Sequence, residues 1–244
     1  MSLTAKLMLS PLLVAQAIST RARLPRLPEP GGDRCGVVGR GQPLQLLITG
    51  DSSAAGVGVV SQSDALAPRL SAMVAAAALA RVSWQLHARS GLTTAQTLML
   101  LRELGSHAAD VAVVVTGVND VVDQVPTRRA LAAREALANW LRNGHGVQHV
   151  VFAPLPPIHQ FPGLPQPLRW VAGADARRHN AALAEWARSR SDVSCVDMDV
   201  PLNRGVMASD GFHPGEPVYR YCASAIASHI ASHVFPTLHL DTPP

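Results

Sequence analysis

Five short strand-like runs, most of them mainly apolar, divide the chain, and longer segments of helical periodicity separate them. The runs cover residues 44–49, 82–87, 111–116, 150–153 and 193–196, and helical spacing marks residues 66–77, 130–141, 172–189 and 216–234. Thr127 is expected to cap the second of these helices at its start and Gly144 at its end. Strands that are apolar on both faces, each followed by a helix, are typical of a parallel sheet covered on both sides. The pattern predicts an α/β fold with about five parallel strands.

The length of 244 residues is sufficient for a full hydrophobic core and is typical of one α/β domain. Residues 24–43 are rich in proline and glycine, which predicts an irregular segment and not a helix or strand. We therefore expect residues 1–41 to form an irregular N-terminal extension and residues 42–238 to form a single domain.

The N-terminal extension contains an apolar stretch over residues 7–17 that closes on an A-x-A pattern, which is typical of a signal peptidase site. Pro11 interrupts the stretch, however, and Arg21 and Arg23 follow it closely, where positive charge opposes translocation. A cytoplasmic protein without a stable membrane span is the favoured interpretation. Export or membrane anchoring through residues 7–17 is the alternative.

Composition argues against several functional classes. The net charge of +4 comes from 21 basic and 17 acidic residues, and the basic residues are scattered and do not form long runs, so nucleic-acid binding is not expected. The three cysteines, Cys35, Cys195 and Cys222, are widely spaced, which predicts neither a disulfide framework nor a zinc site. None of the ten histidines makes a convincing metal set, and no cofactor is expected. The sequence does not indicate an oligomeric state.

Candidate catalytic and oxyanion-binding residues follow four of the five predicted strands. Ser52 comes after the first strand, Gly91 after the second, Asn119 after the third, and the segment Asp210–His213 after the fifth. Ligands of parallel sheets bind beyond the carboxyl ends of the strands. These four segments are therefore expected to meet at one edge of the sheet.

A serine, a histidine and an aspartate in these segments form a candidate catalytic triad. A serine hydroxyl becomes a useful nucleophile only when a base takes its proton, and we assign that base to His213. The imidazole must be held in one tautomer, and Asp210, three residues earlier in a tight loop, has the spacing to bind it. Ser52 is the predicted nucleophile.

Attack on an ester carbonyl places negative charge on its oxygen, which hydrogen-bond donors must stabilise. Three donors are candidates: the backbone N–H of Ser52, the backbone N–H of Gly91 and the side-chain amide of Asn119. Together they predict an oxyanion hole beside the nucleophile.

These residues stand in four blocks, which read Gly50-Asp51-Ser52, then Gly91, then Gly117-Val118-Asn119-Asp120, then Asp210-Gly211-Phe212-His213. The chain resembles the SGNH, or GDSL, hydrolase family in the identity and order of these blocks over about residues 44–235, although Ser53 stands where the GDSL block has leucine. The resemblance implies a flavodoxin-like, three-layer α/β/α fold, metal-free chemistry and an acyl-enzyme on Ser52. Asp51 and Asp120 are expected to support the site. The resemblance does not imply a particular substrate; we expect a small-molecule ester, with its acyl group undefined.

Residues 154–170 contain six prolines interspersed with apolar side chains and follow the fourth predicted strand. We expect this proline-rich segment to border the site and to form part of an acyl or leaving-group pocket. A rigid surface connection is the alternative.

Three other interpretations of the chain remain open. Residues 50–58 are glycine-rich like a phosphate-binding loop, but they lack GK[ST] and GxGxxG. Ser52 and Asp51 after a strand are also common helix caps. A non-catalytic module that binds an acyl or glycan group is the third alternative, although a binding module has no need of a base directed at a hydroxyl. A serine esterase or lipase-like acyl hydrolase is therefore the leading hypothesis.

Overall fold

A six-stranded sheet forms the centre of the protein in the computed structural model, which describes residues 3–105, 108–200 and 202–239. The strands are β1 (Cys35–Val38), β2 (Gln42–Gly50), β3 (Ala80–Ala88), β4 (Val111–Val115), β5 (His149–Phe152) and β6 (Val193–Cys195). They lie in the order β1-β3-β2-β4-β5-β6, and only β1 is antiparallel to its neighbour. The five predicted parallel strands are confirmed within two residues of their expected bounds.

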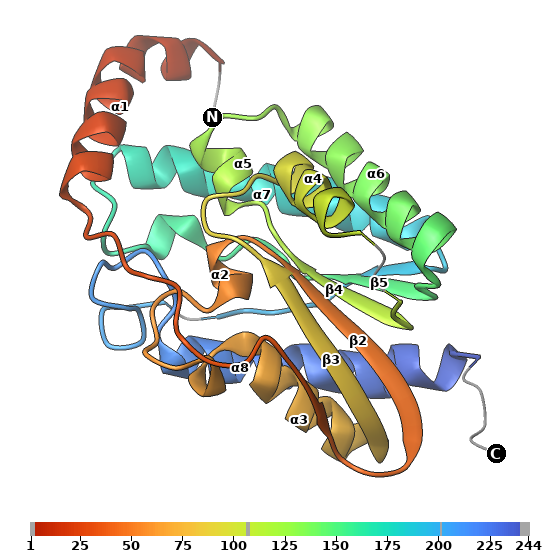
Figure 1. The fold of residues 1–244 in the computed structure, drawn as a ribbon. Coiled ribbons are helices and arrows are strands. Elements are labelled where there is room, and N and C mark those ends of the chain that lie inside the picture. The colour runs from red at the N-terminus through yellow and green to blue at the C-terminus, as the bar shows by residue number, and fades with distance from the viewer. Residues whose placement is uncertain (1–2, 106–107, 201, 240–244) are drawn as a thin grey trace.

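Helices cover both faces of this sheet (Figure 1). One layer holds α3 (Leu66–Ala78) and α8 (Glu216–His229), and the other holds α4 (Thr94–Leu104), α6 (Thr127–His145) and α7 (Leu168–Arg188). Strand β2 contributes to both cores, because Leu46 and Ile48 pack toward the first layer and Leu47 toward the second. This double burial explains why Leu46, Leu47 and Ile48 are consecutive apolar residues, and it confirms the three-layer α/β/α fold.

The helix ends differ in part from the sequence-based expectations. Helix α6 begins at Thr127, so Pro126 takes the capping position. The helix continues through Gly144 to His145, and Gly146, with a left-handed φ of 71°, caps its end. Helix α7 starts earlier than expected, and a short π-helix (Ile230–Val234) continues α8. Two short helices, α2 (Ser52–Ala55) and α5 (Val118–Val122), begin directly after β2 and β4 and position the site.

The N-terminal region departs from the expected irregular extension. It contains helix α1 (Leu3–Arg23) and strand β1, which pairs with β3 from Cys35↔Gln85 to Val38↔Val82. A Cβ on Gly36 would lie 2.9 Å from the indole nitrogen of Trp84, so this glycine allows the close approach of the two strands. A glycine that contributed to the prediction of a loop thus belongs to an edge strand. A strand of four residues is too short to be recognised from its periodicity.

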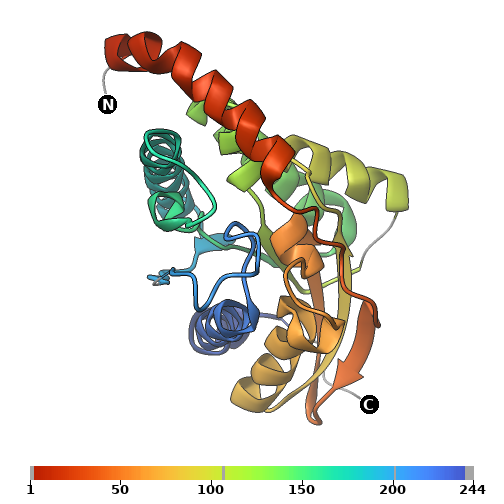
Figure 2. The same cartoon turned by 90° about the vertical axis from the view of Figure 1, so that its left-hand side faces the viewer.

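Helix α1 includes the apolar stretch 7–17 and continues through Pro11. It lies at the outside of the molecule, at the end of the sheet where α2 and α5 begin, and contacts α7 (Figures 1 and 2). Within the described residues, no helix is both long enough and apolar enough to cross a membrane.

Candidate active site

The turn from β2 into α2 presents Ser52 at the carboxyl end of the sheet. Gly50 has a φ of 152°, and a Cβ there would collide with the carbonyl oxygen of Val115 on the neighbouring strand. Asp51 then caps α2, since its carboxylate accepts a hydrogen bond of 2.9 Å from the backbone N–H of Ser53. This glycine and this cap fix the backbone on both sides of Ser52.

The loop between β6 and α8 holds His213 in a tight turn built by Asp210. One carboxylate oxygen of Asp210 accepts hydrogen bonds of 2.9 Å from the backbone N–H groups of Phe212 and His213. The other oxygen lies 2.6 Å from Nδ1 of the His213 ring. The imidazole is thus held by its own turn, with Nε2 left to face another group.

That other group is the hydroxyl of Ser52. Nε2 of His213 lies 3.1 Å from Oγ of Ser52, across a separation of 161 residues in sequence. The Asp210 side chain is 1% exposed and the His213 side chain 20% exposed, so the carboxylate is shielded while the imidazole reaches the surface. The structure therefore brings Ser52, His213 and Asp210 into one hydrogen-bonded line, as their sequence positions predicted.

The three candidate oxyanion donors lie at the same end of the sheet, Ser52 and Asn119 in the short helices α2 and α5 and Gly91 in a loop. Ser52 is the first residue of α2, where a backbone N–H has no partner within the helix. Asn119 donates a 3.0 Å hydrogen bond from Nδ2 to the carbonyl oxygen of Leu92, which ties the start of α5 to the loop of Gly91. An amide nitrogen carries two hydrogens, so one remains for a ligand. Gly91 is exposed, with open space where a Cβ would stand.

Asp120 supports this region from beneath. Its carboxylate accepts hydrogen bonds from the backbone N–H of Thr94 at 3.0 Å and from the Thr94 hydroxyl at 2.6 Å, and that hydroxyl lies 3.0 Å from the hydroxyl of Thr116. The guanidinium of Arg134, itself 1% exposed, is 3.8 Å from Asp120. Asp120 therefore joins α4, α5 and α6 beneath Asn119. Sequence reasoning missed Thr94, Thr116 and Arg134, because neither helical periodicity nor the end of a strand shows that a polar residue faces inward.

Glu29, in the segment between α1 and β1, supports the Gly91 loop from the other side. Its carboxylate accepts hydrogen bonds from the backbone N–H of Ser90 at 2.7 Å and from the Ser90 hydroxyl at 2.8 Å. Arg34 binds the same carboxylate at 2.6 Å and the carbonyl oxygen of Ala88 at 2.9 Å. The N-terminal region thus anchors the loop. No sequence signal could have linked two residues 61 positions apart.

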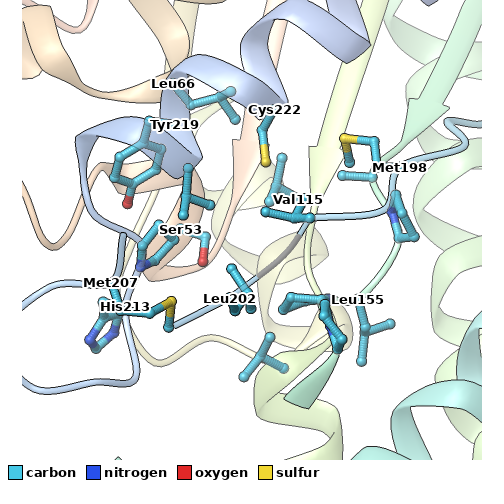
Figure 3. Close-up of a pocket in the computed structure, with 18 of the residues that line it drawn as sticks. Ser53, Leu66, Val115, Leu155, Met198, Leu202, Met207, His213, Tyr219 and Cys222 are labelled. Atoms are coloured by element: carbon cyan, nitrogen blue, oxygen red, sulfur yellow. The ribbon is translucent and has the colours of Figure 1, made fainter. Parts of the chain in front are cut away.

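An apolar pocket of about 90 Å³ opens beside the Ser52 hydroxyl. The proline-rich segment lines it with Pro154, Leu155, Pro156, Pro157 and Phe161, so the expectation that this segment borders the site is confirmed. Figure 3 shows His213 and Ser53 on one side of the pocket and Met198 on the opposite side. Burial raises the pKa of the Cys222 thiol in the wall to about 12, so the lining there is uncharged.

Known proteins share the sequence pattern of this site. A model of the GDSL-like Lipase/Acylhydrolase family matches residues 48–221. The chain belongs to this family. The match includes all four motif blocks, and it confirms the resemblance that those blocks indicated. No curated protein is similar enough in sequence to be matched.

Solved structures of a lipase and of two esterases share the fold at low sequence identity. A lipase, Lip_vut3, from a goat rumen metagenome is 19% identical, with a TM-score of 0.61 over 78% of this chain and 98% of the lipase. The psychrotrophic esterase EstA from Pseudoalteromonas sp., in a structure inhibited by monoethylphosphonate, is 16% identical, with a TM-score of 0.57 over 76% and 98%. An acetyl xylan esterase variant from Geobacillus stearothermophilus is 16% identical, with a TM-score of 0.54 over 81% and 98%. These similarities place the GDSL-family chain in the same fold.

Two buried carboxyl groups of this GDSL-family site differ in their electrostatics. Burial raises the pKa of Asp210, but hydrogen bonds from the His213 ring and from two backbone N–H groups outweigh burial, so its pKa lies below the usual value. Burial raises the pKa of Asp51 to about 7, and only partial compensation comes from the Ser53 N–H and from the nearby His213. Asp210 is therefore a carboxylate at neutral pH, while Asp51 titrates near neutrality.

Replacing Asp51 with asparagine is expected to change how stability depends on pH. The carboxyl has a pKa of about 7 in the folded protein against the usual aspartate value of 3.8, so between these values the folded state binds more protons than the unfolded state. Wild-type stability should therefore fall as pH rises from about 4 to about 7, by about 3 to 5 kcal/mol in total. Asp51→Asn keeps an oxygen for the Ser53 N–H and loses this dependence.

Urea unfolding of both proteins at pH 5 and pH 8 measures this effect. The unfolding free energy of the variant minus that of wild type should be larger at pH 8 than at pH 5. Other titrating groups contribute equally to both proteins and therefore cancel in this difference. Parallel stability curves for the two proteins would show that Asp51 does not carry the shifted pKa.

A second contact between a serine and imidazoles occurs away from this edge. The Ser194 hydroxyl on β6 lies 2.9 Å from Nε2 of His149 and 2.8 Å from Nε2 of His229. Burial lowers the pKa of His149 to about 4, which keeps it neutral. Sequence reasoning saw no partner pattern for these histidines. Within the described residues, no group of three or more His, Cys, Asp or Glu side chains is placed to hold a metal ion.

Proposed function

We propose that this protein is a carboxylic ester hydrolase that acts through a Ser52–His213–Asp210 triad and an acyl-enzyme intermediate. The observation that carries the proposal is the position of His213, whose two ring nitrogens contact Ser52 at 3.1 Å and Asp210 at 2.6 Å. A serine oxygen can lose its proton to a ring nitrogen at this distance, and the carboxylate stabilises the imidazolium that forms. Membership of the acylhydrolase family supports the same activity.

In the proposed reaction, Oγ of Ser52 attacks the ester carbonyl carbon while its proton passes to Nε2 of His213. The tetrahedral intermediate collapses, the ester C–O bond breaks, and His213 returns the proton to the leaving alcohol. Water then attacks the acyl-enzyme with His213 again as base, and the carboxylic acid leaves as Ser52 recovers its proton. Asp210 holds the ring through Nδ1 throughout.

The negative oxygen of each tetrahedral intermediate would be bound by the backbone N–H groups of Ser52 and Gly91 and by Nδ2 of Asn119. Two features of these groups support the assignment. The Ser52 N–H has no partner within its helix, and Gly91 offers no side chain to block an approaching ester. Asp51 and Asp120 act as supports: the first caps α2, and the second fastens α5 to α4.

Turnover of p-nitrophenyl acetate together with labelling by a fluorophosphonate tests this function. A hydrolase should release p-nitrophenol catalytically and take up one label per chain. A non-catalytic acyl- or glycan-binding module would do neither, even though it would bind the corresponding ligand. Binding without turnover would therefore reject the proposal in favour of that alternative.

We further propose that the apolar pocket receives a short acyl chain. An apolar cavity of about 150 Å³ holds benzene, so a cavity of about 90 Å³ has room for an acyl chain of about four carbons. With p-nitrophenol as a constant leaving group, kcat/KM should be higher for the butyryl ester than for the octanoyl ester by about tenfold or more.

Met198→Ala should relax this preference, because Met198 stands across the pocket from His213 (Figure 3). We expect the octanoyl-to-butyryl ratio of kcat/KM to rise by about tenfold. Met99→Ala, on the exposed side of α4, is the matched control and should leave the ratio unchanged. An unaltered chain-length preference in a folded Met198→Ala protein would remove the pocket from the proposal.

A further inference from the structure

Helix α1 presents apolar residues to solvent, and its inward side combines apolar and polar residues. Pro11, Val14, Ile18 and Ala22 recur at helical spacing and are exposed, with Val14 57% and Ile18 66% accessible. We call these four residues the α1 outer face. On the opposite side, Leu9, Leu13, Gln16 and Thr20 are partly buried. A helix that only stabilised its own domain would not also carry apolar side chains on its solvent side, so the α1 outer face is suited to an external apolar partner.

The polar side of α1 connects the helix to the rim of the active site. Nε2 of Gln16 donates to the carbonyl oxygen of Gln166 at 2.7 Å, and Oε1 of Gln16 accepts from the N–H of Leu168 at 3.1 Å. The same loop contacts the catalytic turn, since the N–H of Gly163 donates to the carbonyl oxygen of Gly211 at 2.8 Å. A partner bound to the α1 outer face would therefore be connected to the proposed triad through this single loop.

The formal net charge of the chain lies within its first 28 residues. Residues 1–28 contain four basic residues, Lys6, Arg21, Arg23 and Arg26, and no acidic residue. Since the whole chain has 21 basic and 17 acidic residues, the remaining 216 residues contain 17 of each and are formally neutral. The entire net charge of +4 thus belongs to α1 and the few residues that follow it. This charge is complementary to an anionic surface.

We propose that the α1 outer face docks on a phospholipid bilayer that contains anionic lipids, which places the catalytic edge of the sheet next to the membrane. Exposed apolar side chains, together with arginines near the end of the same helix, are the features by which a helix lies in the interface of such a bilayer. Trp170, 46% exposed at the start of α7, stands two residues from the Gln16 contact and is of a type favoured at membrane interfaces. A symmetric pairing of two α1 helices would instead bring like charges together.

Co-sedimentation of the full chain with vesicles tests the proposal. The protein should bind vesicles of equimolar phosphatidylcholine and phosphatidylglycerol, release from them at high salt, and bind phosphatidylcholine alone at least about tenfold more weakly. Equal binding to both vesicles, or binding to neither, would overturn the proposal.

Two pairs of substitutions separate the apolar and the charged contributions. Val14→Gln with Ile18→Gln should weaken binding to the mixed vesicles by about thirtyfold through lost apolar burial. Arg21→Gln with Arg23→Gln should weaken it by a similar factor and remove most of the preference for phosphatidylglycerol. Because glutamine is a good helix former, α1 should persist, as circular dichroism can verify.

Matched controls lie at the opposite edge of the molecule. Leu79→Gln removes an apolar side chain that is 78% exposed at the end of α3, and Arg81→Gln with Arg102→Gln removes two exposed charges; both proteins should bind vesicles like wild type. Hydrolysis of p-nitrophenyl acetate should be unchanged in every variant, so failure of docking can be told apart from failure of the proposed esterase. A dimer in vesicle-free solution that Val14→Gln with Ile18→Gln dissociates would assign the face to a second copy and overturn the proposal.

Discussion

Ser52→Ala is expected to lower kcat for p-nitrophenyl acetate by about 10⁵- to 10⁶-fold while the protein remains folded. The substitution removes the only oxygen that Nε2 of His213 contacts within the described residues. It should not disturb α2, because the helix is capped by Asp51 and alanine has the highest helix propensity. Steady-state kinetics, with thermal unfolding as the check on folding, measure the effect.

Labelling by a fluorophosphonate provides the control for this prediction. Ser52→Ala should lose the label, and Ser194→Ala should keep it, although Ser194 also lies at 2.9 Å and 2.8 Å from two imidazoles. What Ser194 lacks is a carboxylate bonded to the second nitrogen of either ring among the described residues. Labelling that persists in Ser52→Ala and disappears in Ser194→Ala would move the nucleophile to β6 and contradict the proposed triad.

The central part of the fold and the convergence of the site were predictable from sequence for a common physical reason. Central strands of a covered parallel sheet are apolar on both faces, so β2 and β4 are visible as mainly apolar runs. In a parallel sheet the carboxyl ends of the strands share one edge, so Ser52 and His213 could be expected to meet although 161 residues separate them.

The parts that were not predictable depend on contacts between distant residues of ordinary appearance. Strand β1 has four residues, and the absence of a side chain on Gly36 lets it pair closely with Trp84 of β3. Glu29 fixes the loop of Gly91 through Ser90, and Arg134 approaches Asp120 from an otherwise regular helix. None of these residues belongs to a periodic pattern or a motif, and their partners become apparent only when the sheet has been assembled.

The same edge of the sheet contains two buried aspartates that serve different purposes. The Asp51 carboxylate accepts a hydrogen bond from the backbone N–H of Ser53, and burial raises its pKa to about 7. Asp210 accepts two backbone hydrogen bonds and one from the His213 ring, and its pKa is lowered. Only a carboxylate that stays ionised can stabilise an imidazolium throughout the cycle. We therefore assign the orienting role to Asp210 and a structural role to Asp51.

Asp210→Asn is expected to lower kcat by about 10⁴-fold with little change in KM. Asparagine can keep an oxygen toward the N–H groups of Phe212 and His213, but it then presents an NH₂ group to Nδ1. This donor favours the tautomer in which Nδ1 is the acceptor and Nε2 carries the hydrogen. Such a ring cannot take the proton of Ser52, so the nucleophile is not activated even though the geometry of the turn is preserved.

Two other asparagine variants show whether this loss is specific to the orienting carboxylate. Asp123→Asn, exposed at the end of α5, should leave kcat unchanged. Asp51→Asn should retain most of the activity, since no hydrogen bond joins Asp51 to the imidazole within the described residues. If Asp210→Asn stayed within about tenfold of wild type while Asp51→Asn fell by the larger factor, the electrostatic partner of His213 would be Asp51, and the 2.6 Å contact to Asp210 would serve the turn alone.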